Sequence, residues 1–472
     1  MTILPLDPAA NASPDALGAF LAQCRVAAIA AGHPKLVSIT LAVEALDPLA
    51  VLESIFEPDE PHFYAERPDI GSAIAGAETA TAFEAHGPQR FAAVQRWMDD
   101  ILEHTIAVGE VSAPFGGPHF FAGFTFADEV ETGEPFPAAQ VFVPRWQVAR
   151  AGSMTTAVAN LLVTPDADLA ALTERVWRAH EKFRGFTYHA PASTEMAAPP
   201  HFSVQESGDY HAAVTTALQQ IAAGKFSKIV LARALDLTAS QPLHPLRVLN
   251  GLRQRFPDCY AFSIANGRRQ SFIGASPERL VRVSKGVLET EALAGTTRRG
   301  GGASEDAALA AALLHAEKDL REHHHVVEAV TTRLSELGLA PQCSAQPGLR
   351  RLANLQHLHT PIQATLGGEV RLLDVLARLH PTPAVGGTPQ TAAVSHIRGL
   401  EGFPRGLYAG SIGWLNSRGG GEFFVGLRSA LIEEGNARVY AGAGIVAGST
   451  PEKEFAETEL KFKAMLDALL TP

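Results

Sequence analysis

The sequence contains little cysteine, and its cysteines are scattered. Cys24, Cys259 and Cys343 are the three among 472 residues, and no two of them form a CxxC pair. An odd number at such separations provides neither a disulfide framework nor a thiolate zinc site. We therefore expect a protein of a reducing, cytoplasmic environment.

The sequence also lacks an excess of basic residues and a long apolar run. Its 39 lysines and arginines are outnumbered by 50 aspartates and glutamates, which gives a formal net charge of −11. Nucleic acids and anionic membranes are bound non-specifically by basic surfaces, so we expect neither as a partner. The first residues contain no basic and apolar leader, and the alanine-rich stretch 17–31 is interrupted by Gln23 and Arg25. We expect no signal peptide and no transmembrane span.

The hydrophobic content of 46% is enough for a large core. The residue patterns predict helices at 15–31, 79–104 and 166–183, and strands at 119–126, 154–163, 260–264, 271–273, 421–427 and 438–441. Helices and strands do not alternate strictly, which favours an α+β fold with large antiparallel sheets over a doubly wound parallel sheet. A Pro- and Ala-rich segment at 191–200 separates residues 1–200 from a motif-bearing part, residues 201–472, although such a segment can also be a surface loop.

Two helical turns towards the C-terminal end carry carboxylates spaced three residues apart. They are Asp319 with Glu322, and Glu454 with Glu457. Residues at this spacing share a helix face, and two such faces brought together would form the oxygen-rich site that Mg²⁺ prefers. For a single pair, a solvated helix face or a favourable charge in a first helical turn is the commoner explanation.

Both pairs are predicted to lie beside apolar stripes. The first helix is expected to begin after Ser304, a good N-cap, and to carry one apolar stripe through residues 309–337. Asp319 and Glu322 fall on a flank of that stripe rather than on the far, solvated face. The second helix is expected to begin at residues 449–452, where a hydroxyl cap and a proline in the first turn are typical of a helix start.

Three further positions could carry chemistry, and each has an alternative explanation. Lys228 begins a strand that is apolar on both faces, so its side chain either extends past the sheet end or is desolvated, which favours the neutral amine of a general base. Glu278 is a loop carboxylate that could equally serve a turn or a salt bridge. The small residues around Gly442 allow close approach of the backbone to a ligand, or simply a tight turn.

Nine segments in order carry a resemblance to a known family. They are residues 63–68, 121–126, 144–146, 228–233, 274–278, 293–296, 318–323, 380–387 and 441–461. Together they resemble the chorismate-binding enzymes, a family of isochorismate, salicylate, anthranilate and aminodeoxychorismate synthases. The resemblance implies a single domain over residues 1–472, with a two-layered, largely antiparallel β core wrapped by helices and the active site between the layers.

Three positions within this resemblance favour one reaction. Family members that deliver water have a lysine where Lys228 stands, whereas members that deliver ammonia typically have glutamine. Ala294 stands where aminodeoxychorismate synthases have a lysine for covalent catalysis. Residues 379–387 are most similar to those of isochorismate synthases. The resemblance therefore implies an isomerase that converts chorismate, a small anionic substrate, to isochorismate.

Alternatives remain open on the sequence alone. A salicylate synthase would go on to eliminate pyruvate, and an anthranilate synthase large component would need a glutamine-hydrolysing partner. A lysine at position 228 implies no obligatory glutamine amidotransferase partner. A non-catalytic chorismate-binding protein would have no physical reason to keep a base, an acid and four carboxylates together. Menaquinone, catechol siderophores and salicylate are all compatible destinations of the product.

The resemblance also implies a role for each candidate residue. Glu322 and Glu457, with Asp319 and Glu454 acting through water, would hold Mg²⁺ against the ring carboxylate of chorismate. Lys228 would act as the general base on water and Glu278 as the general acid on the departing hydroxyl. The residues implied in substrate binding are Tyr408 and Arg428 for the enolpyruvyl carboxylate, the Gly442 N–H and Lys461 for the rest of the anion pocket, and Thr296 as a lining residue.

Overall fold

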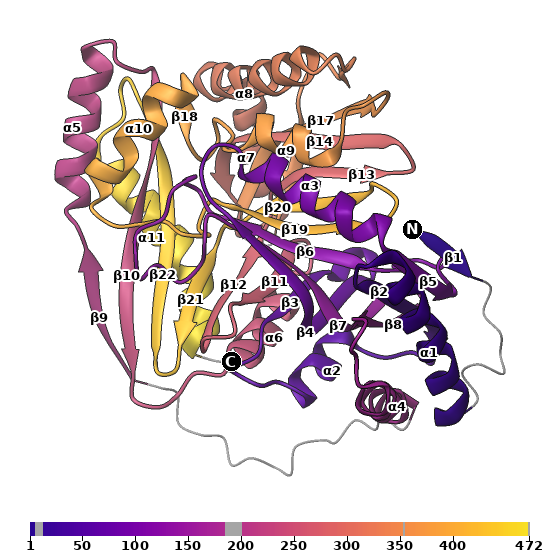
Figure 1. The fold of residues 1–472 in the computed structure, drawn as a ribbon. Helices are drawn as coiled ribbons and strands as arrows, with labels where there is room; N and C mark the ends of the chain where they lie inside the picture. Colours follow the sequence, from indigo (N-terminus) through magenta and orange to yellow (C-terminus); the bar gives the residue numbers. More distant parts are fainter. Residues whose placement is uncertain (5–12, 185–200, 353–354, 471–472) are drawn as a thin grey trace.

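Two layers of strands share one continuous hydrogen-bonded sheet (Figure 1). The described residues of this computed structural model are 1–4, 13–184, 201–352 and 355–470. The first layer runs in spatial order through β9 (Phe202–Ser207), β10 (Lys228–Ala239), β22 (Asn436–Val446), β21 (Ser429–Glu433), β12 (Gln270–Ser276), β11 (Tyr260–Ala265), β3 (His62–Arg67), β4 (Ser72–Ala85), β7 (Ala139–Ala151), β8 (Met154–Val163), β2 (Lys35–Val43), β5 (Thr105–Gly109) and β1 (Thr2–Leu4). These pairs are antiparallel except β1–β5 and β2–β5. A mixed helix and strand fold with a large antiparallel sheet is therefore confirmed.

The second layer branches from the first within β7. The first residues of β7 pair with β6 (His119–Phe124), whereas its last residues pair with β8. From β6 the layer continues through β19 (Ser411–Asn416), β20 (Gly421–Val425), β13 (Arg279–Ser284), β14 (Val287–Arg298) and β17 (Leu355–Thr365), with β15 (Gln342–Cys343) and β16 (Gly348–Arg351) on its edge. Pro144 has no N–H for the ladder, and its partner on β4 is Thr79. The register of β4 shifts between Thr79 and Thr81, and the preceding Glu78 has a φ of +56°. The branch therefore lies where the sequence itself interrupts regular pairing.

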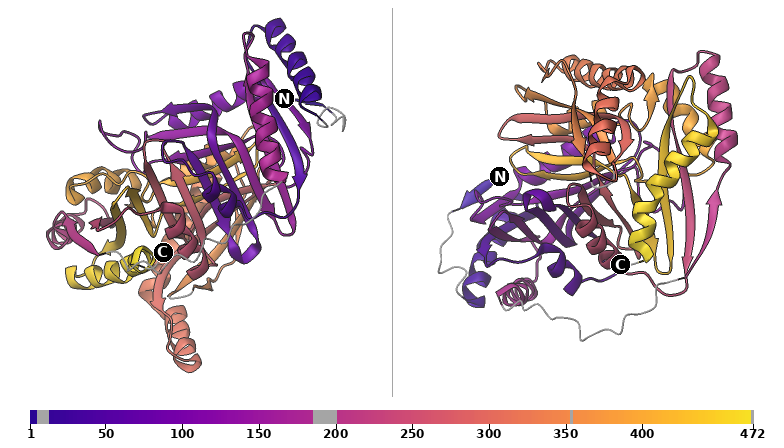
Figure 2. Two further views of the ribbon diagram at one scale, coloured as in Figure 1. Left: turned by 90° about the horizontal axis from the view of Figure 1, so that it is seen from below. Right: turned by 180° about the vertical axis from the view of Figure 1, so that it is seen from behind.

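Helices cover the outer faces of both layers. Helices α1 (Pro14–Ala31) and α4 (Leu169–Arg184) lie over β2 and β8, and α2 (Pro48–Ser54) and α6 (Pro245–Arg255) lie over β4 and β11. The second layer is contacted by α7 (Ala303–His315), α8 (Glu317–Glu336) and α9 (Leu372–Leu379), and α3 (Arg90–Glu103) packs on α9, β4 and β7. Helices α5 (Tyr210–Ala222), α10 (Gln390–Glu401) and α11 (Pro451–Leu470) cover β10 and β22, and α11 is seen along these strands in the right view of Figure 2.

The main hydrophobic core lies where the two layers meet. Phe63 of β3 stacks on Phe121 of β6 with ring centroids 4.4 Å apart, and both side chains are fully buried. Phe262 of β11 similarly meets Phe424 of β20 at 5.1 Å. Such aromatic contacts across the layers bury large apolar areas and fix the layers against each other. No helix in the described ranges is both long enough and apolar enough to span a membrane.

Three expectations from the sequence meet a different outcome. Residues 79–104 are not one helix: β4 continues to Ala85, and α3 begins at Arg90 after the Gly87-Pro88 break. The helix expected after Ser304 begins earlier, with Gly302 as the N-cap, and ends at His315; Ala316 is extended, and α8 follows. The apolar stripe expected over 309–337 is therefore divided between two helices. The boundary segment 191–200 lies outside the described residues.

Candidate active site

A pocket between the two layers collects most of the candidate residues. It encloses about 970 Å³ of empty space, including its open mouth, and strands β10, β14 and β22 and helices α8 and α11 contribute to its wall. The candidate residues that line it are Lys228, Glu278, Thr296, Glu322, Tyr408, Arg428, Gly442, Glu457 and Lys461. Asp319 and Glu454 do not line it; they lie one helical turn before Glu322 and Glu457 on α8 and α11.

Lys228 is buried at the start of β10 and forms an ion pair. Its backbone is held on both sides, by Val446 of β22 and by Thr388 of the short strand β18 (Gly387–Thr388). Its Nζ donates to Glu322 Oε1 at 2.6 Å. A Cβ on Gly444 of β22 would lie 3.2 Å from Lys228 Cε, so this glycine leaves the space through which the lysine reaches α8. Lys228 is therefore buried and paired with Glu322, and its side chain does not extend into solvent.

Glu278 lies between β12 and β13 and is 8% exposed. Burial, reinforced by the negative charge of Glu291, raises the pKa of Glu278 to about 7, although a hydrogen bond from Thr382 and the charge of Lys228 act in the opposite direction. The Thr382 hydroxyl donates to Glu278 Oε1 over a long 3.5 Å. A carboxyl group with this pKa keeps its proton in a large fraction of molecules near neutral pH. It has the charge state that a general acid requires.

Arg428 is a half-buried cation in the wall of this pocket. Within the part of the chain that the structure describes, its guanidinium forms no ion pair, and its hydrogen-bonding contact is from Nη1 to Cys259 Sγ at 3.9 Å. Burial lowers the pKa of Arg428, yet guanidinium remains charged in proteins. Its φ of +46° is an uncommon backbone conformation that is frequent at ligand sites. A guanidinium that lines a pocket and has no ion pair among the described residues indicates a binding site for an anion.

Gly442 and Lys461 form a second group of polar atoms in the pocket wall. Gly442 is opposite Ala232 of β10, and the Ala232 N–H donates to Glu401 instead of to β22. Ala232 and Gly442 are therefore a non-hydrogen-bonded pair of the antiparallel ladder. In such a pair the N–H and C=O of Gly442 point away from β10. The C=O accepts a hydrogen bond from Lys461 Nζ at 2.7 Å. A Cβ on Gly442 would lie 2.8 Å from the Tyr408 hydroxyl, so a side chain here would displace that tyrosine.

The carboxylates of α8 and α11 are engaged by lysines in this structure. Glu322 is paired with Lys228, and Glu457 accepts from Lys461 Nζ at 2.8 Å. No three His, Cys, Asp or Glu side chains in the described ranges lie close enough to hold an ion together. Burial raises the pKa of Asp319, and the charge of Glu322 adds to this effect. The carboxylate oxygens of Glu322 and Glu457 line one pocket and are the hard ligands that a divalent cation prefers. To bind such an ion, they would have to release Lys228 and Lys461.

The pocket contains two features that the sequence did not single out. His357 of β17 bonds through Nδ1 to Thr296 Oγ1 at 2.8 Å, and its Nε2 has no partner among the described residues. Burial lowers the pKa of His357 to about 3, so its ring is neutral. His357 and His359 share one face of a strand, a period-two signal that could have identified them.

The second of these features is the buried ion pair of Glu401 and Arg405 at an edge of β10. Glu401 Oε1 accepts the Ala232 N–H at 2.7 Å, and Arg405 Nη2 donates to the Val230 C=O at 2.7 Å. The two side chains satisfy backbone groups at a stretch of β10 that lies between its pairings with β18 and β9. They belong to different parts of the chain from β10, so no local pattern predicts the contact.

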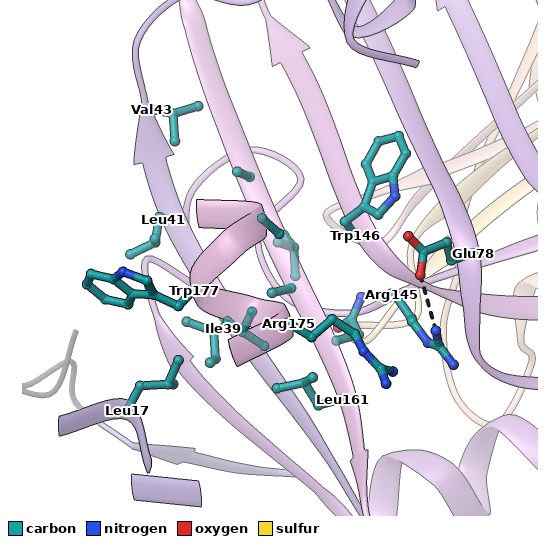
Figure 3. Close-up of a pocket in the computed structure, with 16 residues that line it drawn as sticks. Leu17, Ile39, Leu41, Val43, Glu78, Arg145, Trp146, Leu161, Arg175 and Trp177 are labelled. Atoms are coloured by element: carbon teal, nitrogen blue, oxygen red, sulfur yellow. Dashed lines mark hydrogen bonds and ion pairs between the residues drawn. The ribbon is translucent and has the colours of Figure 1, made fainter. Parts of the chain in front are cut away.

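Another pocket lies in the N-terminal part of the chain (Figure 3). Leu17, Ile39 and Leu161 are among its apolar lining residues. Its described charged residues are Glu78, Arg145 and Arg175, and Arg145 is ion-paired with Glu78 at 3.2 Å. These groups do not combine a general acid with a general base, so we assign the active site to the pocket between the layers.

Comparisons with known proteins agree with this geometry. A family model described as "Chorismate binding enzyme" matches residues 19–470. The "Salicylate biosynthesis isochorismate synthase" of Pseudomonas aeruginosa is 37% identical over 443 residues, which cover 93% of this chain and 90% of that protein. "Isochorismate synthase MenF" of Bacillus subtilis is 32% identical over 446 residues, which cover 93% of this chain and 94% of that protein.

Solved structures show the same fold. MenF, the menaquinone-specific isochorismate synthase from Escherichia coli, matches with a TM-score of 0.78 and 27% identity over 93% of this chain and 95% of that chain. Anthranilate synthase component I from Streptococcus pneumoniae matches with a TM-score of 0.66 and 23% identity over 84% of this chain and 92% of that chain. Because the family model spans nearly the whole sequence, this chain belongs to the chorismate-binding enzyme family.

Proposed function

We propose that this protein is an isochorismate synthase, an isomerase that converts chorismate to isochorismate. The observation that carries the proposal is the pocket itself, which places Lys228, a Glu278 with a pKa of about 7 and the guanidinium of Arg428 around one cavity. The similarity to isochorismate synthases over 93% of the chain supports the same activity. A base, an acid and an anion site together are what the exchange of a hydroxyl group on an anionic ring requires.

The proposed chemistry assigns one proton transfer to each group. Lys228 accepts a proton from the water that attacks C2 of the ring, and Glu278 donates its proton to the hydroxyl that leaves C4. The ring double bonds shift between these positions, and isochorismate is released. In this structure Lys228 Nζ donates a hydrogen bond to Glu322. Base catalysis therefore requires that this ion pair open and that the amine lose its proton.

The remaining lining residues bind and orient the substrate. Arg428 offers a planar guanidinium to the enolpyruvyl carboxylate, with the Tyr408 hydroxyl nearby. Lys461, the Gly442 N–H and Thr296 complete the anion pocket. Glu322 and Glu457 would hold Mg²⁺, with Asp319 and Glu454 acting through water. When bound, the ion would supply positive charge to the ring carboxylate of chorismate.

Product identification tests this proposal. The purified protein is incubated with chorismate and Mg²⁺, and the products are separated by chromatography and identified by mass spectrometry. We expect isochorismate to accumulate, and isochorismate supplied alone to return chorismate, because attack and loss of water at the two positions are chemically symmetric. Salicylate with pyruvate would instead establish a salicylate synthase. An aminated product with ammonia would indicate an anthranilate synthase large component.

A further inference from the structure

A group of charged side chains lies directly behind the general acid. Glu291 of β14 accepts hydrogen bonds at Oε1 from Arg350 Nη1 at 2.7 Å and from the backbone N–H of Arg279 at 3.1 Å. Its Oε2 lies 2.9 Å from His359 Nε2. Arg279 is the residue that follows Glu278, so Glu291 holds the backbone of the loop on which the general acid stands.

Glu291 is buried and nevertheless ionised. Its side chain is 7% exposed, which acts to raise its pKa, but the hydrogen bond from His359 and the charge of Arg350 hold the pKa of Glu291 near 2. Glu278 is the opposite case, because burial and the charge of Glu291 raise its pKa to about 7. Two neighbouring carboxyl groups thus have their pKa values driven apart, an arrangement typical of acid–base sites.

Other groups also face Glu278, and they act against Glu291. Lys228 from β10 and Arg350 from β16 each favour the ionised form of Glu278 by their positive charge. Thr382, after α9, favours it by its hydrogen bond. The Tyr408 phenol is neutral, because burial raises its pKa well above neutrality. Among these groups, Glu291 alone brings a negative charge that favours the protonated form.

We propose that Glu291 is a positioning residue for the general acid: it anchors the Glu278 loop through the Arg279 amide, and its fixed negative charge keeps the proton on Glu278. Arg350 and His359 in turn fix Glu291. This inference rests on the proposed role of Glu278 in isochorismate formation. It adds a carboxylate that does not line the substrate pocket but sets the charge state of one that does.

The test compares E291Q with the matched control E289Q. Glu289 lies on the same face of β14 and pairs with Arg279 and Arg282 side chains, but it does not bind the Arg279 amide. The proton on Glu278 is titrated in the substrate-free protein by infrared difference spectroscopy, with E278Q identifying the band. We expect E291Q to move the Glu278 midpoint to lower pH by roughly one unit. The basic limb of the kcat/KM profile, which reports the substrate-free enzyme, should move in the same direction, and E289Q should leave both in place.

A second variant tests the anchoring and covers the case in which E291Q does not fold. E291D keeps the negative charge but is one methylene too short to reach both Arg350 and the Arg279 amide. We expect kcat to fall roughly ten- to a hundredfold, with KM and the basic limb unchanged. An unmoved Glu278 midpoint in folded E291Q, or normal kcat in E291D, would overturn the inference. Failure of the proposed function is distinguishable, because the wild-type protein would then form no isochorismate while the spectroscopic titration still reports the coupling.

Discussion

Glu278 is a single carboxyl group whose proton is retained near neutral pH. Burial raises its pKa to about 7, and a general acid acts only while it is protonated. The pH profile of kcat/KM reports the pKa values of the substrate-free enzyme, so we expect kcat/KM to fall as the pH rises through about 7. E278Q, which cannot transfer a proton, should lower kcat by roughly 10²–10⁴. Steady-state kinetics over a neutral pH range measure both effects, and a rate that keeps rising with pH would contradict the assignment.

Arg428 should determine substrate affinity through its shape as well as its charge. R428K keeps a positive charge but loses the planar fork, and R428Q loses both. We expect KM for chorismate to rise roughly tenfold in R428K and roughly a hundredfold in R428Q. R438K is a suitable control, because Arg438 pairs with Asp236 and does not line the pocket. An unchanged KM in R428Q would remove Arg428 from the anion site.

The location of an individual residue could be predicted where its sequence neighbours identify the element that contains it. Lys228 was predicted at the start of a strand buried on both faces, and the structure places it there. Glu278 was predicted in a loop between strands, which is also confirmed. The pairing of Lys228 with Glu322 could not be predicted, because 94 residues separate them. Arg405 and Glu401 were missed for the same reason: their partners on β10 are distant in sequence.

Helices α8 and α11 bring Glu322 and Glu457, the proposed metal carboxylates, to one pocket. If Glu322 and Glu457 hold Mg²⁺, E322Q and E457Q should each weaken Mg²⁺ binding roughly tenfold or more. E328Q is the matched control, because Glu328 is an exposed residue of α8. Isothermal titration of the protein with MgCl₂ measures the affinity without turnover. Equal affinity in all three variants would mean that the ion, if bound, lies elsewhere.

Element boundaries were predictable only where capping residues are specific. The start of α11 was predicted correctly from Ser449 and Pro451. The break at Ala316 was not, because no glycine or proline marks it in the sequence, although Ala316 is extended in the structure. The segment 79–85 is rich in Ala and Thr and was predicted as helix, yet its long pairing with β7 makes it a strand.

At the scale of the whole molecule, the active site is assembled from both layers and from helices of the outer shell. A ligand that binds there contacts β10, β14, α8 and α11 together. Chorismate with Mg²⁺ at about a hundred times its dissociation constant should therefore stabilise the folded protein by about 2.7 kcal/mol. Differential scanning fluorimetry should show a rise in Tm of several degrees for the wild type and a smaller rise for R428Q. No rise with the wild type would contradict binding at this pocket.

The α+β class followed from the irregular order of helices and strands, whereas the two layers were expected only from the family resemblance. Alternation of apolar residues cannot show which strands pair when the partners are far apart, as with β3 and β11 or β6 and β19. Strands from both sides of the segment 191–200 form these pairs. The branch of the sheet at Pro144 could not be predicted either. A proline within a strand indicates that pairing is interrupted, but it does not indicate which strand pairs with the residues beyond it.

The hydrogen bonds of Glu401 and Arg405 to the backbone of β10 have a consequence for the rate at which this strand edge opens. The Ala232 amide is protected by the Glu401 carboxylate and not by a neighbouring strand. Its hydrogen exchange should therefore report each undocking of the Glu401 side chain, while amides of β10 bonded to β22 should exchange only when the sheet itself opens. In R405M, which leaves Glu401 buried without its cation, we expect faster exchange at Ala232 than at Leu231 or Arg233. Mass spectrometry of deuterated peptides would show whether the strand that presents Lys228 keeps its shape independently of α10.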